Sequence, residues 1–413
     1  MNVFDPDNKA AKIAVTDCGE NTFAMEPLVL SGGSRHRASL NDLAVTLAAA
    51  SSGFKRSLPP SIAASLADLV RAMNSYYSNL IEGHHTHPVD IERAMKSDYS
   101  ADPEKRNLQL EAKAHVAVQA WIDGGGVAGH VFAAASLREV HRRFSDMLPG
   151  ELLSVTDPDS GRTIQVVAGE FRNDDVRVGR HLAVSPGAVP RFMARFEEVY
   201  GGLGKSEIIL AAAAAHHRFL WVHPFADGNG RVARLMSHAS LLETLDTGSL
   251  WSVARGLARN AAEYKQHLAS CDAERRGDLD GRGNLSEEAL AAFTEFFLRI
   301  CLDQIRFMEN LVRPDRLRDR ILLWAEEEVR AGTLLQKSGQ VLEAVLYRGE
   351  LARGDVAQLL DFSDRSARRV VSSLLERGVL VSESTRAALT LAFPAALAAR
   401  WMPGLFPEST ERA

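Results

Sequence analysis

Apolar residues recur at helical spacing through most of the chain, and this pattern limits the fold more than any other feature. Between Ser61 and Gly83 they fall three and four positions apart, as on the buried face of an amphipathic helix. Further stretches with this spacing, each bounded by Gly or Pro clusters, lie at about 107–123, 131–147, 190–200 and 205–222. The middle of the chain is therefore expected to be mainly α-helical.

Two parts of the chain depart from this pattern. Residues 1–60 show weak periodicity with Ser, Gly and Pro clusters, so loops or a loosely packed arm are expected there. Residues 163–168 are rich in β-branched side chains and are followed after a short turn by 176–178. This composition predicts a small β-hairpin between the two segments.

The C-terminal part begins with long helical patterns that reach about Leu311 and then cover 316–330. Residues 338 to about 394 follow the order helix, turn, helix (353–361), turn, helix (364–377) and two short strands. That order predicts a winged helix-turn-helix.

The third helix of this module would be the recognition helix of a DNA-binding domain. It carries Arg365, Arg368 and Arg369, which could meet phosphates, but nearby carboxylates nearly offset their charge. DNA binding and a protein-docking or dimerisation role therefore both stay open. The carboxylates are Asp361, Asp364 and Glu376.

Charge and composition limit the location and the partners. The 413 residues carry a net charge of −5, so no global positive field draws the molecule to nucleic acid or anionic lipid. No apolar run approaches the roughly 18 residues of a membrane span, and no signal peptide is present, so we expect a cytoplasmic protein without a membrane partner. The three cysteines, Cys18, Cys271 and Cys301, form no CxxC pair and are expected to be reduced.

The segment His223-Pro-Phe-Ala-Asp-Gly-Asn-Gly-Arg-Val-Ala-Arg234 lies between two helical patterns. Pro224 ends the first helix at His223, because proline lacks a backbone donor and disfavours the helical region for the residue before it. The glycines on either side of Asn229 precede a helix expected to start near Arg231, where free N–H groups and the positive dipole end point outward. These features predict a phosphate-binding cradle, and we refer to residues 223–234 as the motif loop.

The side chains around this cradle have the chemistry of nucleotidyl transfer. Arg231 and Arg234 lie three positions apart on one helix face and can reach the same polyphosphate. Asp227 offers an oxygen ligand for Mg²⁺. His223 can accept the proton of an attacking hydroxyl, since imidazole titrates near neutral pH.

At these residues the chain resembles the Fic family, whose HxFx(D/E)GNGRxxR motif is matched at every fixed position from His223 to Arg234. The resemblance implies a helical Fic-type core in which His223 is the catalytic base and Asp227 the Mg²⁺ ligand. It also implies that Gly228, Asn229 and Gly230 hold the α- and β-phosphates of ATP. Arg231 and Arg234 would hold the β/γ end.

Two further segments are similar to family features. Residues 169–179, which include Val176, resemble the flap that aligns the target segment by strand addition beside the nucleotide. Tyr264 resembles a family position near the nucleoside. The segment Ser78-Asn-Leu-Ile-Glu-Gly83 resembles the inhibitory motif (S/T)xxxE(G/N), so that Glu82 is expected to pair with Arg234 and misplace ATP.

The expected domains are an N-terminal region 1–105 with the inhibitory helix 61–83, a Fic catalytic core 106–312, and a linker helix with the winged helix over 313–413. The expected function is transfer of AMP from Mg-ATP to a Ser, Thr or Tyr hydroxyl of a target protein, restrained by Glu82. Removal of AMP is a second activity that the sequence leaves undecided, and a homodimer is among the states that it allows. The alternative is a DNA-binding regulator whose Fic core senses a nucleotide.

Overall fold

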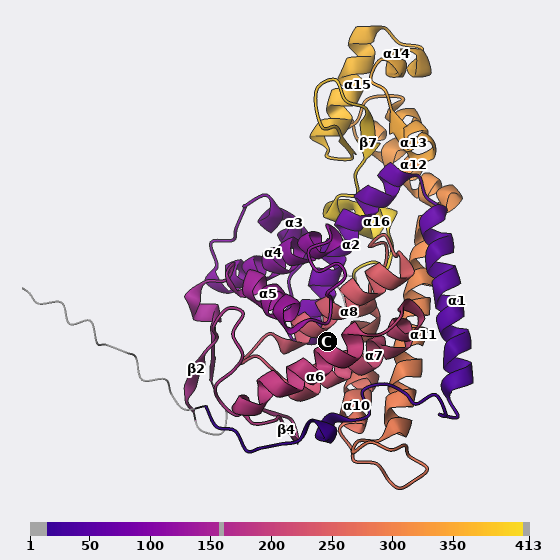
Figure 1. Cartoon of the computed structure of the whole chain (residues 1–413). Coiled ribbons are helices and arrows are strands. Elements are labelled where there is room, and N and C mark those ends of the chain that lie inside the picture. Colours follow the sequence, from indigo (N-terminus) through magenta and orange to yellow (C-terminus); the bar gives the residue numbers. More distant parts are fainter. Residues whose placement is uncertain (1–14, 157–160, 408–413) are drawn as a thin grey trace, which may run out of the picture.

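The computed structural model describes residues 15–156 and 161–407. It is mainly α-helical, as the apolar spacing predicts, and Figure 1 shows one helical body from which a smaller C-terminal module projects. The helices of the body are α1 (Arg37–Arg56), α2 (Pro60–Ile81), α3 (Pro88–Met95), α4 (Pro103–Asp123), α5 (Ala134–Ser145), α6 (Val189–Gly201), α7 (Lys205–Val222), α8 (Asn229–Leu245), α9 (Val253–Arg259), α10 (Ala261–Cys271) and α11 (Glu287–Val312).

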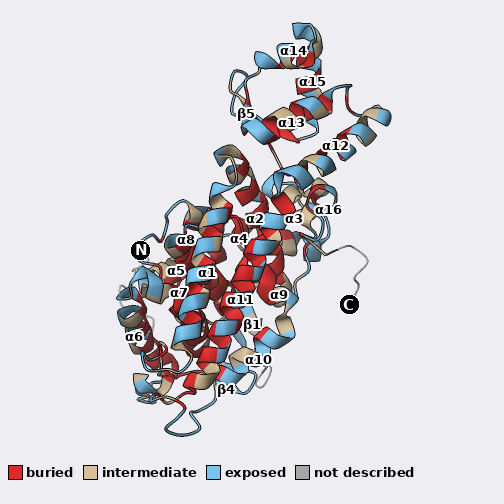
Figure 2. Ribbon diagram, turned by 90° about the vertical axis from the view of Figure 1, so that its right-hand side faces the viewer, coloured by how far each residue is buried: buried red, intermediate tan, exposed pale blue. Residues whose placement is uncertain are grey.

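Helix α7 lies at the centre of the body. Its alanine run, Ala211 to Ala215, is buried and has small side chains, which let neighbouring helices approach closely. Helices α8 and α11 pack directly against α7. Figure 2 shows the buried residues concentrated on these helices and on α2.

Local sequence signals explain several helix starts. Pro60 stands in the first turn of α2, where its missing N–H costs nothing. The side chains of Asp102 and Ser286 cap α4 and α11 by accepting hydrogen bonds from the N–H groups of Glu104 and Ala289.

The C-terminal module combines helices with a three-stranded antiparallel sheet of order β5-β7-β6. Its chain order is helix, strand, two helices and two strands, with a strand where a turn was expected; the winged helix-turn-helix and its function stay predictions. The boundary expected near 312 falls between α11 and α12, and the division into domains also stays a prediction. The elements are α12 (Pro314–Arg330), α13 (Ser338–Arg348), β5 (Glu350–Leu351), α14 (Asp355–Leu360), α15 (Asp364–Glu376), β6 (Leu380–Val381), β7 (Leu389–Leu391) and α16 (Ala398–Trp401).

This module and the segment after it contact helix α2. At the start of α2 the Ser61 hydroxyl donates to the Gly349 carbonyl over 2.7 Å. Further along, the Tyr77 hydroxyl donates to the Leu405 carbonyl over 2.9 Å, and the rings of Tyr76 and Phe406 meet edge to face. The last described residues are thus packed on the helix that carries Ser78.

The predicted hairpin between 163–168 and 176–178 is wrong. Instead β2 (Thr163–Gln165) pairs with β1 (Ser154–Thr156), and β3 (Arg177–Val178) pairs with β4 (His181–Leu182). The intervening segment does not turn back on itself, because the Arg172 N–H donates to the carbonyl of Pro224 in the motif loop. Residues 169–179 therefore run beside the motif loop before they enter the second hairpin.

The expectation of loops throughout residues 1–60 is also wrong. Helix α1 covers Arg37–Arg56 and packs lengthwise on α11 through a buried stripe. The stripe comprises Leu40, Ala44, Leu47, Ser51 and Phe54. Two of these five side chains are small or polar, so the apolar face of α1 is too weak in the sequence to stand out.

Candidate functional site

His223 stands at the end of α7 in a left-handed conformation, with φ 50° and ψ 63°. Its N–H still bonds to the Phe219 carbonyl over 3.0 Å, so the helix closes at this residue. Pro224 prevents a further helical turn, as the sequence predicts. The imidazole is therefore held at a fixed helix end.

The tautomer of His223 follows from its one hydrogen-bond partner. Nδ1 lies 3.3 Å from the Leu220 carbonyl, which can only accept, so Nδ1 carries the proton and Nε2 keeps a free lone pair. Burial lowers the pKa of His223 to about 4. At pH 7 the imidazole is therefore a neutral proton acceptor, and its role as the catalytic base stays a prediction.

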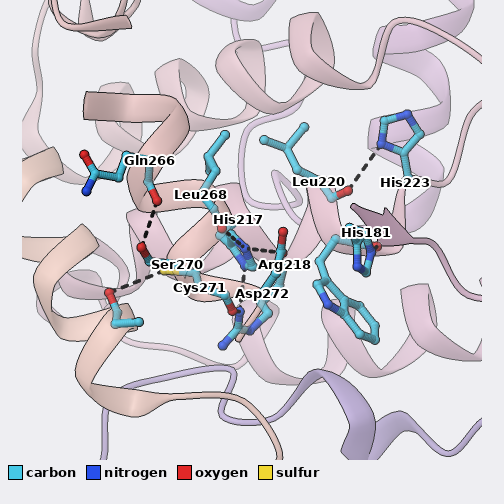
Figure 3. A network of polar contacts seen from close by, with 12 residues as sticks. His181, His217, Arg218, Leu220, His223, Gln266, Leu268, Ser270, Cys271 and Asp272 are labelled. Atoms are coloured by element: carbon cyan, nitrogen blue, oxygen red, sulfur yellow. Dashed lines mark hydrogen bonds and ion pairs between the residues drawn. The ribbon is translucent and has the colours of Figure 1, made fainter. Parts of the chain in front are cut away.

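Figure 3 shows His223 apart from a second polar cluster on α7 and α10. There His217 bonds to the Asp272 carboxylate over 3.0 Å, and Arg218 donates to the Cys271 carbonyl over 3.3 Å. These groups bond to one another and lie away from the Nε2 side of His223. The cluster therefore joins α7 to α10 and adds nothing to the proton acceptor.

The start of α8 presents free backbone donors. Helix α8 begins at Asn229, after Gly228 in a left-handed conformation with φ 79°. Among the hydrogen bonds of the described residues, none uses the N–H groups of Gly228, Asn229, Gly230 or Arg231. Such donors at a helix N-terminus can bind anions, so the backbone offers the donors that the predicted cradle needs.

The Asn229 side chain shapes the loop and is not free for a ligand. Its Oδ1 accepts from the Phe225 N–H over 3.0 Å, and its Nδ2 donates to the Phe225 carbonyl over 2.8 Å. The amide thus closes the turn between α7 and α8. Asn229 can contribute its N–H to a phosphate, whereas its side chain keeps the cradle open.

A carboxylate of the chain itself fills part of this cradle. A Cβ added at Gly230 would lie only 2.4 Å from Glu82 Oε1, so the Glu82 carboxylate sits directly over the glycine. Only glycine permits that approach. The Glu82 carboxylate occupies a place from which the free N–H groups of α8 would otherwise meet a phosphate.

Glu82 is held there by Arg234. Arg234 Nη2 donates to Glu82 Oε1 over 2.5 Å, and Arg234 Nε donates to the Ser78 hydroxyl over 2.8 Å. Burial raises the pKa of Glu82, but the charges of Arg234 and Arg231 outweigh this effect and the net pKa is lowered. Gly83, with φ 88°, ends α2 just beyond the contact.

Glu111 on α4 belongs to the same site, although no signal in the sequence points to it. Its carboxylate is buried, lies 3.9 Å from Arg231 Nη2, and accepts from His84 Nδ1 over 2.7 Å. The hydrogen bond to Glu111 raises the pKa of His84. Glu111, on α4, thus places a carboxylate close to the Arg231 guanidinium on α8.

Asp227 fits the role of a magnesium ligand. Its carboxylate is 47% exposed beside the cradle and lies 3.7 Å from Arg231. Within residues 15–156 and 161–407 no group of three or more His, Cys, Asp or Glu side chains could hold a metal alone. Mg²⁺ typically takes one or two carboxylates and completes its shell with phosphates and water, which one exposed aspartate satisfies.

Two predicted ligand residues are not at the cradle surface. Tyr264 is 2% exposed, and its hydroxyl bonds to His216 Nε2 over 2.7 Å in the interior behind Arg234. The Val176 carbonyl accepts from the Ala183 N–H at the second hairpin. The Tyr264 hydroxyl and the Val176 carbonyl are thus used within the chain, and the roles of both residues stay predictions.

Residues 131–241 match the model of the Fic/DOC family. This region of the chain matches a Fic domain. It runs from just before α5 to near the end of α8 and includes the motif loop and residues 169–179. Ser78, Glu82 and Tyr264 lie outside the matched residues, so the family match does not test the inhibitory motif or the role of Tyr264.

The relatives of the Fic domain are distant and are matched only in part. Protein adenylyltransferase Fic of Culex quinquefasciatus is 37% identical over 111 residues, 26% of this chain and 19% of the relative. The protein of the same name from Drosophila melanogaster is 36% identical over 106 residues, 25% of this chain and 18% of the relative. The chain therefore spans about a fifth of the length of these relatives.

Among solved structures, a Fic family protein from Desulfovibrio desulfuricans G20 has a TM-score of 0.49 and 18% identity, covering 85% of this chain and 96% of its own. At this identity and score the likeness supports no conclusion about activity. No helix within the described ranges is long and apolar enough to cross a membrane.

Proposed function

We propose that the chain is a protein adenylyltransferase that transfers AMP from Mg-ATP to a Ser, Thr or Tyr hydroxyl of another protein. The observation that carries this proposal is that the motif loop has a neutral imidazole acceptor, His223 Nε2, at its first residue and free N–H groups at the start of α8. The relatives are named protein adenylyltransferase, and this name supports the same reaction.

The reaction needs a proton acceptor and a charged grip on a triphosphate. The target oxygen bonds to the α-phosphorus, its proton passes to His223 Nε2, and the bond to the bridging oxygen breaks so that pyrophosphate leaves. The N–H groups of residues 228–231 hold the α- and β-phosphates, while Arg231 and Arg234 hold the β/γ end. Mg²⁺ at Asp227 would neutralise phosphate charge.

His223→Ala tests this proposal in a Glu82→Gly background. Labelling of protein by ATP radiolabelled at the α-phosphate is expected to fall to the background level, while ATP labelled at the γ-phosphate labels neither variant. His130→Ala is the matched control, because His130 is exposed in the loop before α5. Equal labelling with and without His223 would contradict the assignment of the base.

Glu82 is the brake in this proposal. Its carboxylate satisfies Arg234 and covers Gly230, so ATP that binds must either displace it or leave its own γ-phosphate misplaced. Because the pKa of Glu82 is lowered, the carboxylate stays ionised at neutral pH and the ion pair persists.

Glu82→Gln separates charge from shape at this position. The amide keeps the size of the side chain but loses the ion pair, so target labelling and ATP affinity are both expected to rise. Asp68→Asn on the same helix is the control, since Asp68 pairs only with Arg71. If target labelling is unchanged in both Glu82→Gln and Glu82→Gly, Glu82 does not inhibit the reaction.

The same carboxylate could serve the reverse reaction by orienting water against an AMP-modified hydroxyl. A target protein loaded with AMP decides this point. If the wild-type chain releases AMP from this target and the Glu82→Gln variant does not, the removal of AMP is assigned to Glu82.

A second candidate function is DNA binding through α15. Arg365, Arg368 and Arg369 are exposed on this helix, and no hydrogen bond or ion pair is found for them among the described residues. They border an open surface hollow of about 690 Å³. Like charges three and four positions apart destabilise a helix, so an anionic partner would stabilise this one.

Binding of a duplex DNA library tests this second candidate. Affinity that falls steeply with salt and is lost in Arg368→Ala/Arg369→Ala supports it. Arg330→Ala on α12 is the control, because Arg330 is exposed but paired with Glu326. Retention of the full cellular effect in His223→Ala would favour a regulator over a transferase.

A further inference from the structure

Arg172 is a buried cation whose partners are backbone carbonyls. Arg172 is only 3% exposed. Its Nε donates to the His223 carbonyl over 2.7 Å, and its Nη1 donates to the Asp174 carbonyl over 2.8 Å. Nη2 donates to the carbonyls of Val184 and Val222. Burial lowers the pKa of Arg172 to about 10.

No ion pair to this guanidinium is found among the described residues, although the charges of Asp175, Glu20 and Asp174 partly oppose the lowering of its pKa. Burying a charge without a partner of opposite sign is costly, and carbonyl dipoles offset only part of that cost. A well-packed apolar side chain could fill the volume without the penalty. The position of the donors, rather than stability, is therefore the property that Arg172 supplies.

Two of the four carbonyls that the Arg172 side chain binds lie at the end of α7. The last carbonyls of a helix have no partner within it, and His223 adds the strain of a left-handed conformation in a residue with a side chain. Arg172 satisfies the carbonyls of Val222 and His223 together, and its own N–H binds the Pro224 carbonyl over 2.9 Å. These bonds fix the backbone from which the His223 ring projects.

His141 on α5 makes a second connection between the same two segments. Its Nδ1 accepts from the Gly169 N–H over 2.9 Å, and its Nε2 donates to the Asp227 carbonyl over 3.2 Å. The ring stacks on Phe225 with centroids 4.0 Å apart. Residues 169–179 are thus bonded to the motif loop at Asp227 as well as at His223.

We propose that Arg172 is a positioning residue that holds the base His223 and, together with His141, keeps residues 169–179 at a fixed distance from the motif loop. The proposal rests on the proposed function, in which residues 169–179 present the target hydroxyl. In this proposal, Arg172 fixes the position of His223 for proton transfer, and His141 fixes the position of the target segment.

Arg172→Lys and Arg172→Met, each in the Glu82→Gly background, test the first part. A lysine keeps the charge but cannot reach carbonyls in four directions, so both variants are expected to lower kcat about 100-fold, the effect of a small misplacement. ATP affinity is expected to stay within about twofold, since Arg172 does not touch the cradle. Arg299→Met, exposed on α11 and paired only with Glu295, is the control.

Proton NMR of the imidazole rings gives a readout that does not depend on transfer. In the full chain with ring-labelled histidine, the signal of His223 is identified by its loss in His223→Ala. The charged or titratable groups that face His223 are Arg172, Asp227 and His181. Removal of the Arg172 charge in Arg172→Met is expected to raise the pKa of His223, whereas Arg299→Met leaves it unchanged.

His141→Phe tests the second part, because phenylalanine keeps the stack on Phe225 but removes both hydrogen bonds. The KM for the target protein is expected to rise about tenfold, with ATP affinity unchanged; a loss of one to two hydrogen bonds has this size. His130→Phe is the control.

The outcomes separate this proposal from the proposed function. If Glu82→Gly labels no protein but the His223 pKa rises in Arg172→Met, the positioning role stands and the transferase fails. If the folded Arg172 variants label at the parent rate and the His223 titration is unmoved, the positioning role is wrong. Should Arg172→Met fail to fold, Arg172→Lys decides by kcat and ATP affinity, because lysine keeps the charge but cannot bind the four carbonyls.

Discussion

At the residue scale, the proposed reaction uses the His223 imidazole through its position rather than through a tuned pKa. With a pKa of about 4 it is a weak base, yet it is neutral across the physiological range. Burial gives this state, because the ring has little water to stabilise its charged form.

The pH–rate profile of Glu82→Gly should reflect that state. The folded pKa lies below the ordinary value, so His223 stays unprotonated as the pH falls from 8 to 6, and the rate of transfer is expected to change little. The rate should fall tenfold per pH unit only below about pH 4, where Nε2 becomes protonated. Initial rates of labelling in buffers of constant ionic strength measure this, and an acid limb centred near pH 6.5 would contradict it.

At the scale of elements, α2 and α8 are joined by a hydrogen bond from Arg234 Nε to the Ser78 hydroxyl. Ser78→Ala leaves the Nε of a buried guanidinium without its acceptor, because Arg234 is 3% exposed. The free energy of unfolding is expected to fall by about 1–3 kcal/mol, the cost of an unsatisfied buried donor. Urea denaturation measures it. Ser65→Ala on the same helix, for which no hydrogen bond is found, should change stability by much less.

Helix α1 is an integral part of the body. Leu47 is fully buried where α1 packs on α11. Leu47→Ala is expected to lower the free energy of unfolding by about 2–5 kcal/mol. Val45→Ala, at a side chain 70% exposed on the same helix, is the comparison. Equal effects of the two changes would mean that α1 adds little to the core.

These elements show what could be predicted from the sequence. Helix α7 was predicted to its ends, because a long apolar pattern stops at Pro224, and the cradle followed from glycines placed before a helix. Helix α1 was missed, because its buried face contains small and polar residues. Glu111, His141 and Arg172 were missed as site residues, because only tertiary packing brings them to the motif loop.

At the scale of the whole molecule, buried histidines make stability depend on pH. Burial lowers the pKa of His115 and His216 to about 3 and that of His217 to about 4. The unfolded chain binds protons at these positions near pH 6.5, whereas the folded chain does not. Their contribution is therefore complete above pH 6.5 and is lost as the pH falls toward 4.

The midpoint of thermal unfolding is thus expected to be lower at pH 5 than at pH 7.5. Differential scanning calorimetry at both pH values measures the difference. His216→Gln, which cannot be protonated, should reduce it. A midpoint that rises on acidification would show that other groups dominate.

The contact between the last described residues and α2 joins the C-terminal segment to the helix that leads into Glu82. Tyr77 donates to the Leu405 carbonyl one position before Ser78, so α2 cannot tilt to withdraw Glu82 without straining that bond. A partner that displaced residues 402–407 would lower the free energy that a nucleotide needs to expel Glu82. A nucleotide that expelled Glu82 would likewise lower the free energy that the partner needs. Linkage requires the two effects to be equal in free energy.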